Sequence, residues 1–410
     1  MILKKVPIIF PFLAHYRKGV MEELCRNTDG NIDYEIISGH KPNSSSILLI
    51  DEKKAEIPIA KGGLRWRFTK NRWLGKAFLW QSKVWRLPFQ YHRGPMIFMG
   101  VSYYISTLLA MIIAKFTRTR VLLWTHGYRS AKGGLRNFYR TFFYRLADGF
   151  LLFGNRGREI MIMHGFRPES LYVVYNSLPY RKQLEARSKV DIRQAIINAR
   201  KLFDNPAPVL IWSGRLVKGK KIEFLIKALG EMNKYGKPAN LILIGDGPLR
   251  PRLEKMVAEH NIENLCRFHG ACYDEEQLAQ LFMGSDLCVS TGPIGLLAIH
   301  AMGYGLPVLT NDDFNSQGPE AEAIVEGETG AFFKDGDLGD FIAKIKQCLD
   351  SLCRDRQTAR QKCQLVIDNY YSPARMTREI NRAVLGLPPS TDKPADLFRK
   401  RGNRSSHSLA

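Results

Sequence analysis

The sequence predicts an α/β protein with two doubly wound domains, and three observations support this fold class. Short β-branched or aliphatic runs alternate with helical segments along almost the whole chain, a pattern typical of parallel sheets with helices on both faces. These runs form two series, separated by the polar, basic stretch 181–204. The chain of 410 residues is also long enough for two or three domains with full hydrophobic cores.

The first series begins at the N-terminus. We interpret the apolar start as a strand and not as a signal peptide, because Pro7 and Pro11 interrupt it and no small-residue cleavage site follows. Residues 95–114 are uncharged and long enough to suggest a membrane span, but their pattern favours a strand, a turn at Gly100 and a helix from Ser102. The expected strands are Val6–Phe12, Tyr34–Ser38, Met96–Met99, Val121–Trp124, Gly149–Phe153 and Leu171–Val174.

The second series has the same alternation. Its expected strands are Val209–Trp212, Asn240–Ile244, Cys266–His269, Leu287–Ser290, Pro307–Thr310 and Gly330–Phe333, and its amphipathic helices include Ile222–Tyr235, Arg250–His260 and Asp274–Met283. We expect domains at 1–180 and 181–365, a helix at 366–387 returning to the first domain, and a disordered basic tail at 388–410. Ligands of doubly wound sheets bind at the carboxyl ends of the strands, so a cleft between the domains is the expected site.

The composition narrows the class of protein. Apolar residues make up 45% and charged residues 24%, which is ordinary for a globular protein and excludes disordered, collagen-like and multi-span membrane classes. The seven cysteines are scattered without a C-x-x-C pair. They argue against a disulfide scaffold or a zinc ribbon and fit a reducing cytosol.

The positive charge is concentrated in the first domain. The formal net charge is +22, and no acidic residue lies between Glu56 and Asp148. A field of one sign predicts a negative partner, and interleaved tryptophan and basic residues favour an anionic membrane surface, contacted through residues 61–86. A solvated basic face is the alternative. No nucleic acid is expected, because no zinc-finger, RNP or helix-turn-helix pattern is present. The basic residues of this segment are Lys61, Arg65, Arg67, Lys70, Arg72, Lys76, Lys83 and Arg86.

Three motifs in the second domain follow strands and precede helices. Residues 213–221 (SGRLVKGKK) contain Gly214 and place Arg215 with Lys220 or Lys221 at a strand end, where they could hold phosphate oxygens. Residues 241–248 end in a turn at Gly245. Residues 292–308 begin with a Gly-x-x-Gly loop that opens a helix. The N–H groups near Gly295, Leu296 and Leu297 would therefore suit a pyrophosphate.

In this order and spacing, the three motifs resemble the nucleotide-binding half of GT-B glycosyltransferases, in particular the retaining family 4 (glycosyl transferases group 1) type. The resemblance covers residues 208–345 and includes Phe268-His269-Gly270, the following 274–278 segment and the 319–330 segment. The first domain matches more loosely, through Thr125-His126-Gly127, 174–176 and the loop 15–18. The resemblance implies two Rossmann-like domains facing across a cleft.

The resemblance also implies residue roles. Arg215 and Lys220 would hold the donor diphosphate and stabilise the departing nucleotide, and His126 would contact the transferred sugar, unless it is a histidine satisfied in a strand-end turn. Tyr16 and Arg17 would bind the acceptor. The implied donor-binding residues are Gly214, Lys221, Gly245, Gly270, Cys272, Tyr273, Gly295, Leu296, Leu297, His300, Glu320 and Glu322.

One departure from the family pattern concerns a Glu-x7-Glu pair, whose positions here read Gly292 and His300. In the family the second glutamate grips the ribose hydroxyls. His300 could donate to a ribose oxygen but could not bind a diol as a carboxylate does, so a deoxyribose donor such as a dTDP-sugar is one hypothesis. Glu320 or Glu322 would replace the lost carboxylate contact with the sugar.

The expected reaction is glycosyl transfer from a nucleotide-diphosphate sugar to a lipid-linked or polysaccharide acceptor in surface glycan biosynthesis, with retention as the resemblance implies. We expect no cofactor or metal, because no His/carboxylate cluster has metal-ligand spacing and basic residues with a helix N-terminus can neutralise the diphosphate. The expected location is the inner face of the cell membrane, as a cytoplasmic peripheral protein. The alternatives are a catalytically degenerate GT-B subunit that binds nucleotide or membrane, and a sugar-nucleotide 2-epimerase.

Overall fold

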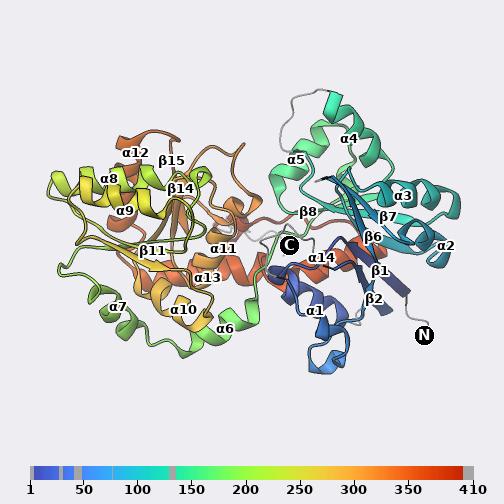
Figure 1. Ribbon diagram of the computed structural model, residues 1–410, viewed down its shortest axis with the longest axis horizontal. Helices are drawn as coiled ribbons and strands as arrows, with labels where there is room; N and C mark the ends of the chain where they lie inside the picture. The colour runs from blue at the N-terminus through green and yellow to red at the C-terminus, as the bar shows by residue number, and fades with distance from the viewer. Residues whose placement is uncertain (1–3, 27–30, 41–48, 76, 129–134, 400–410) are drawn as a thin grey trace, which may run out of the picture. The chain divides into compact units, whose positions relative to one another are not determined.

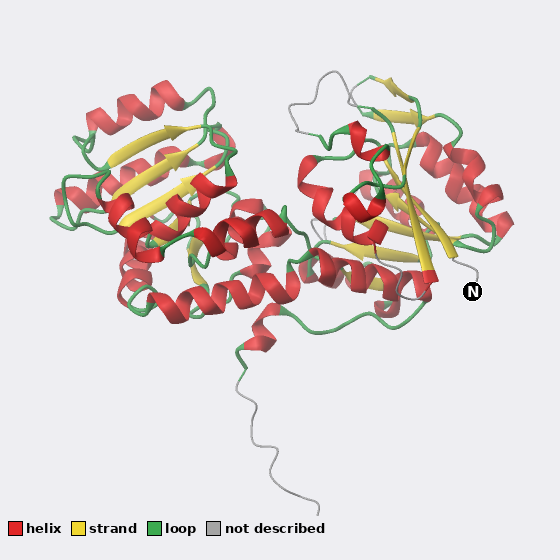
Figure 2. Ribbon diagram, turned by 90° about the horizontal axis from the view of Figure 1, so that it is seen from below, coloured by secondary structure: helices red, strands yellow, loops and turns green. Residues whose placement is uncertain are grey.

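The computed structural model describes residues 4–26, 31–40, 49–75, 77–128 and 135–399, and these form two compact units (Figure 1). Unit 1 contains residues 1–190, 314–320 and 371–390, and unit 2 contains 191–313, 321–370 and 391–410. In each unit a parallel sheet has helices on both sides (Figure 2). The expected α/β fold class is therefore confirmed.

Unit 1 is built on seven strands that all pair in parallel. Chain order reverses between β1 and β6, which makes the sheet doubly wound. The sheet order is β3 (Trp66–Phe68), β2 (Ile32–Ser38), β1 (Lys4–Phe10), β6 (Pro95–Met99), β7 (Arg120–Thr125), β8 (Gly149–Leu152) and β9 (Leu171–Val173).

Helices cover both faces of this sheet. On one face, α1 (Lys18–Arg26) and the late helix α14 (Pro373–Leu385) pack on the strands, and the Tyr34 hydroxyl donates to Asn381 Oδ1 at 2.7 Å. The other face is covered by α2 (Leu87–Gln90), α3 (Ile105–Thr117), α4 (Leu135–Arg145) and α5 (Asn155–Met163). Shorter elements are η1 (His15–Arg17), η3 (Glu52–Ala55), η4 (Ile59–Lys61), η5 (Val84–Arg86) and η6 (Pro168–Ser170), and α6 (Tyr180–Lys189) ends the first segment of unit 1.

A two-stranded hairpin that we did not predict lies within the basic segment. Its strands β4 (Asn71–Leu74) and β5 (Phe78–Gln81) are antiparallel. Gln81 fixes the hairpin to the unit, because its side-chain amide donates to Phe10 O and its backbone N–H donates to Ser106 Oγ, both at 3.0 Å. Lys76, between these strands in the sequence, lies outside the described residues.

Unit 2 has six parallel strands, and its order reverses between β10 and β13. The sheet order is β12 (Cys266–Gly270), β11 (Asn240–Ile244), β10 (Val209–Ser213), β13 (Leu287–Ser290), β14 (Val308–Asn311) and β15 (Gly330–Phe333). The helices are α7 (Ile192–Arg200), α8 (Ile222–Lys234), α9 (Arg250–Glu259), α10 (Glu275–Gly284), α11 (Leu296–Gly303), α12 (Leu338–Asp350) and α13 (Arg356–Tyr370), with η7 (Lys218–Lys220), η8 (Pro319–Ala323) and η9 (Pro394–Leu397).

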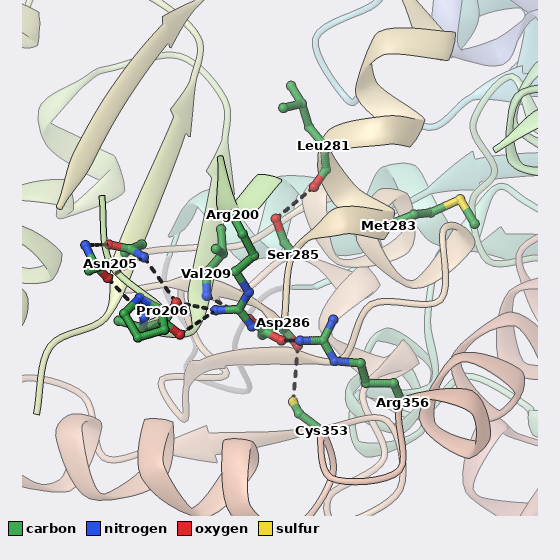
Figure 3. Close-up of polar contacts among 12 residues, drawn as sticks. Arg200, Asn205, Pro206, Val209, Leu281, Met283, Ser285, Asp286, Cys353 and Arg356 are labelled. Carbon is green, nitrogen blue, oxygen red and sulfur yellow. Dashed lines mark hydrogen bonds and ion pairs between the residues drawn. The ribbon is translucent and has the colours of Figure 1, made fainter. Parts of the chain in front are cut away.

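A buried carboxylate holds the start of β13 in unit 2 (Figure 3). Asp286 accepts from the Val209 N–H at 2.7 Å and from Arg200 Nη2 at 2.8 Å, and it also contacts the guanidinium of Arg356. The Cys353 thiol donates to the Asp286 carbonyl at 3.1 Å. One side chain thus links α7, β10 and the start of α13, and buried charges of this kind are stable only when paired.

The strands expected from the sequence are confirmed, with end shifts of at most two residues. Residues 95–114 form β6, a turn and most of α3, as expected, and none of the helices in the described part of the chain is long and apolar enough to cross a membrane. The expected tail is described as far as Arg399 and contains η9, so that part has structure; residues 400–410 lie outside the described residues.

Candidate functional site

The strand order of unit 2 points to the loops that follow β10 and β13. These strands are neighbours, yet the chain leaves β10 toward β11 and leaves β13 toward β14. At such a switch point the two loops diverge, and ligands of doubly wound sheets bind there, outside the carboxyl ends of the strands. The predicted phosphate motifs 213–221 and 292–308 follow these two strands.

Three predicted glycines are brought together at this edge of the sheet. The Gly214 N–H donates to Ile244 O at 2.9 Å, and the Gly245 N–H donates to Gly270 O at 2.8 Å. Gly245 has φ +133°, and a Cβ built on it would lie 1.8 Å from Gly214 O. Only glycine allows that approach, so the loops after β10, β11 and β12 are packed backbone to backbone.

The two lysines of the first motif point to different partners. Lys220 Nζ donates to Pro293 O at 2.6 Å, within the loop that leads to α11. Lys221 has φ +51°, and its Nζ lies 2.7 Å from Asp335 in an ion pair. The left-handed residue turns the chain into α8 and separates the two side chains. The structure therefore brings the side chain of Lys220, and not that of Lys221, to the Gly-x-x-Gly loop.

Arg215 lies at the carboxyl end of β10, two residues beyond Ser213. Its side chain is exposed, and no hydrogen bond or ion pair engages its guanidinium within the described part of the chain. By contrast, the neighbouring Leu216 is buried and its backbone N–H donates to Asp246 O at 3.0 Å. A fixed backbone with an available guanidinium is suited to an anionic ligand.

The N-terminus of α11 completes the predicted diphosphate site. No side chain among the described residues caps it, and the N-cap residue Gly295 has φ +54°. The first N–H groups of a helix have no intrahelical acceptor, so those of Leu296 and Leu297 can donate to an anion. Two hydrogen bonds hold the loop that precedes α11: Ser290 Oγ donates to Gly292 O and Asn311 Nδ2 donates to Thr291 O, both at 3.1 Å.

His300 lies one helical turn along α11 and contacts a carboxylate that sequence reasoning missed. Its Nε2 lies 2.9 Å from Glu275 Oε1, and the Tyr304 hydroxyl donates to the same oxygen at 2.7 Å. Glu275 is the first residue of α10, and Cys272 and Tyr273 lie in the turn just before it. The sequence feature that could have indicated this carboxylate was the acidic run 274–276, but such a run predicts the start of a helix equally well.

The predicted sugar and acceptor residues belong to unit 1, apart from Glu322. The His126 ring is exposed, with its centroid 4.5 Å from that of Phe153. Arg17 is buried against the rings of Phe10, Trp124 and Phe153, and this burial lowers the pKa of Arg17. Its neighbour Tyr16 is half-buried.

The two glutamates proposed as carboxylate replacements fall in different units. Glu320 is buried in unit 1, where its Oε1 accepts from Asn176 Nδ2 at 3.0 Å. Glu322 belongs to unit 2 and is half-buried.

An Asp-x-Asp sequence occurs at Asp335-Gly336-Asp337 and is the pattern that most suggests a metal. Asp335 pairs with Lys221, and Asp337 accepts from the Asp340 N–H at 3.0 Å at the start of α12. Both carboxylates thus have structural partners. No group of three or more His, Cys, Asp or Glu side chains in the described ranges could hold a metal ion.

Comparisons with known proteins concern the family and the fold of the chain. Residues 194–364 match the model of the family described as glycosyl transferases group 1. The chain is 26% identical over 187 residues to the glycogen synthase of Mycobacterium tuberculosis strain H37Rv, covering 45% of this chain and 44% of the relative. It is 29% identical over 146 residues to the alpha-monoglucosyldiacylglycerol synthase of Acholeplasma laidlawii, covering 34% of this chain and 35% of the relative. The chain thus spans less than half the length of these curated relatives.

The likeness to a solved structure extends over both units. The crystal structure of HepE from Anabaena in complex with UDP superposes with a TM-score of 0.64 at 16% identity, covering 94% of this chain and 100% of HepE. At this identity the likeness concerns the fold. Residues 194–364 thus belong to the glycosyl transferases group 1 family, and the two parallel sheets of the chain form the GT-B fold.

Proposed function

We propose that this protein is a glycosyltransferase that takes a sugar from a nucleotide-diphosphate donor bound at the carboxyl edge of the unit 2 sheet. The observation that carries the proposal is the contact of Lys220 Nζ with Pro293 O at 2.6 Å. It places an ammonium group beside the uncapped N-terminus of α11, at the switch point between β10 and β13. A helix N-terminus with an adjacent cation is suited to a diphosphate.

Arg215, Lys220 and the amides of Leu296 and Leu297 then act on the leaving group. When the bond from the anomeric carbon to the diphosphate oxygen breaks, its electron pair passes to the diphosphate, and these donors stabilise the added negative charge. The acceptor hydroxyl forms the new bond and loses its proton. In the retaining, front-face path that we propose, the departing phosphate oxygen takes this proton, and His126 contacts the sugar.

Glu275 supports a ribonucleotide donor. The hypothesis of a deoxyribose donor depends on a ribose site without a carboxylate, since His300 replaces the expected glutamate. The carboxylate of Glu275, held by His300 and Tyr304 at 2.9 and 2.7 Å, lies immediately after the 270–273 turn proposed for the base. A carboxylate can accept from both hydroxyls of a ribose diol.

We further propose that the acceptor is lipid-linked or a polysaccharide and that transfer occurs at the cytoplasmic face of the membrane, in surface glycan biosynthesis. The support is the acid-free, basic segment 57–147 of unit 1 and the names of two relatives, one an alpha-monoglucosyldiacylglycerol synthase and one a glycogen synthase. Buried Arg17 and half-buried Tyr16, next to the carboxyl end of β1, are the proposed acceptor contacts.

The proposal is tested by a thermal-shift panel of UDP, GDP, dTDP, ADP and CMP. One diphosphate should raise the melting temperature, with about 2.7 kcal/mol of stabilisation at a hundredfold excess over its Kd. Arg215→Ala should remove the shift, whereas Arg193→Ala, which removes another exposed arginine of unit 2, in α7, should keep it. Slow hydrolysis of the matching nucleotide-sugar would then show catalysis.

A nucleotide-binding or membrane-binding subunit without activity is the second candidate, because Gly292 and His300 replace both expected glutamates. Binding of a nucleotide without any hydrolysis or transfer would favour it. Absence of a shift with every diphosphate would contradict the donor site itself.

A further inference from the structure

Unit 1 carries a group of exposed apolar side chains that its own core does not use. Phe116 is 84% exposed, Phe138 is 77% exposed and Leu74 is 60% exposed. We call the group the apolar surface; it consists of the hairpin tip, the outer side of α3 and the outer side of α4. Its members are Leu74, Phe78, Ile105, Leu109, Ile112, Phe116, Phe138 and Phe142.

The three parts of the apolar surface are connected at the turn that opens α3. Leu74 and Phe78 are cross-strand partners in the hairpin, and the Phe78 ring lies 6.0 Å from that of Tyr103. From the other side, the Tyr139 hydroxyl of α4 donates to Ser102 O at 3.0 Å. The hairpin tip and α4 therefore both adjoin residues 102–103, the turn that leads into α3.

Helix α3 is apolar on the outside as well as the inside. Ala110, Met111 and Ala114 face the core, while Ile105, Leu109, Ile112 and Phe116 recur at the spacing of one helical face and are exposed. A helix that is apolar all round is normally buried. The outer stripe of α3 is therefore suited to a non-aqueous partner.

The segment that carries the apolar surface is rich in basic residues. No acidic residue lies between Glu56 and Asp148, and Asp148 is paired with Lys115 at 2.8 Å. At the base of the hairpin a cavity of about 360 Å³ is lined by Lys70 and Lys83, together with the hydroxyl-bearing Thr69 and Ser82. Both lysines are exposed, and neither has an ion pair in the described part of the chain. The cavity thus offers ammonium groups to an anionic headgroup.

We propose that the apolar surface and this lysine cavity dock on a bilayer that contains anionic phospholipid. The aliphatic and aromatic side chains would enter the acyl boundary while the lysines bind headgroups. A second copy of the chain would bring the same positive charge, which disfavours self-association through this face. The inference does not rest on the proposed transfer reaction, since a protein without a donor site could still bind lipid in this way.

The proposal revises the membrane surface expected at 61–86. Within that segment Arg65 pairs with Asp33 at 2.8 Å and Arg67 with Glu35 at 3.5 Å, so both cations already have counter-charges in the protein. Lys70, Leu74, Phe78 and Lys83 stay available, and α3 and α4 supply most of the apolar area, outside the expected range.

Vesicle flotation tests this docking surface with the full chain. Vesicles of phosphatidylcholine alone are compared with vesicles that also contain phosphatidylglycerol, at matched size and salt. The wild-type protein should float with the anionic vesicles. Phe116→Ser/Phe138→Ser should lower the partition coefficient at least tenfold, whereas Tyr235→Ser, at a 71% exposed aromatic of unit 2, should not.

The lysines are tested separately from the apolar residues. Lys70→Gln/Lys83→Gln should reduce binding roughly fivefold per lysine, while Lys201→Gln/Lys237→Gln, which removes the same charge from unit 2, should leave it within twofold. Unchanged melting temperatures show that the variants fold. Three results would overturn the proposal. They are failure of the wild type to float, an equal loss of binding in the control variants, and binding of single-stranded RNA in preference to the vesicles.

Discussion

His300 Nε2 lies 2.9 Å from Glu275 Oε1, so the histidine of α11 presents a carboxylate that originates from α10. The Tyr304 hydroxyl holds the same oxygen at 2.7 Å. The family pattern would place a glutamate at position 300 itself. In this chain a carboxylate is available within hydrogen-bond distance of that position, supplied by the preceding helix α10.

Glu275→Gln should therefore weaken UDP binding by roughly tenfold or more, since a hydrogen bond to a charged group contributes about 1.5–3 kcal/mol. Discrimination between UDP and 2′-deoxy-UDP should disappear in the variant, and calorimetric titration with both nucleotides measures this. Glu263→Gln, at an exposed glutamate before β12, is the matched control. If Glu275→Gln kept the wild-type preference for UDP over the deoxy form, Glu275 would not bind the ribose.

Gly292 should not tolerate even a methyl group. A Cβ there would lie 2.6 Å from Lys220 O and 2.7 Å from Lys220 C, so the 292–295 loop would have to shift. Gly292→Ala should lower the free energy of unfolding by about 1–3 kcal/mol and reduce nucleotide affinity, as measured by denaturant titration and thermal shift. Gly219→Ala is the control, because its Cβ would meet no atom within 4 Å. Equal affinity in the two variants would argue against a nucleotide at this loop.

Most of the fold could be predicted because each strand and helix follows from the pattern of residues within its own segment. Strands such as β11 (NLILI) are buried throughout and flanked by turn residues, so composition alone locates them. The hairpin β4–β5 was missed because its short strands are only half-buried and the charged segment masks their alternation. Which of Lys220 and Lys221 reaches the loop depends on the left-handed conformation of Lys221. A positive φ is uncommon for a lysine, so nothing in the sequence indicated it.

The part of the candidate site that the sequence did not predict, Glu275, depends on contacts between elements that are separate in the chain. Glu275 and His300 are 25 residues apart and meet only because the fold brings side chains of α10 and α11 into contact. Likewise the role of Asp286 is visible only once α7, β10 and α13 converge on it. Spacing along the chain carries no information of this kind, whereas the phosphate loops are contiguous and were therefore predictable.

Cys272 should be the first thiol to react in the native protein. It is half-buried in the 270–273 turn, whereas the other six cysteines are buried. Burial raises the pKa of Cys266 and of Cys348 to about 12, and it also raises the pKa of Cys25, Cys288, Cys353 and Cys363. Only the thiolate is nucleophilic, so a raised pKa disfavours reaction at neutral pH.

Labelling with Ellman's reagent at pH 8 should thus show one fast phase, absent in Cys272→Ser and kept in Cys266→Ser. A bound nucleoside diphosphate should slow this phase at least tenfold, since Cys272 is a predicted contact of the base. A nucleotide that raises the melting temperature without protecting Cys272 would place the base elsewhere.

Asp286→Asn should destabilise unit 2 without altering the nucleotide site. The carboxylate is buried and binds Arg200, Arg356 and the Val209 N–H, so the amide would leave two arginines without their counter-charge. Removing one partner of a buried pair lowers the free energy of unfolding by about 3–5 kcal/mol. Because both arginines are partly exposed, we expect a loss near the lower end of this range, about 3 kcal/mol. Denaturant titration measures it, with Asp204→Asn at an exposed aspartate as the control. A loss below 1 kcal/mol would mean that solvent replaces the ion pairs, and that α7 and α13 are held to β13 by apolar packing alone.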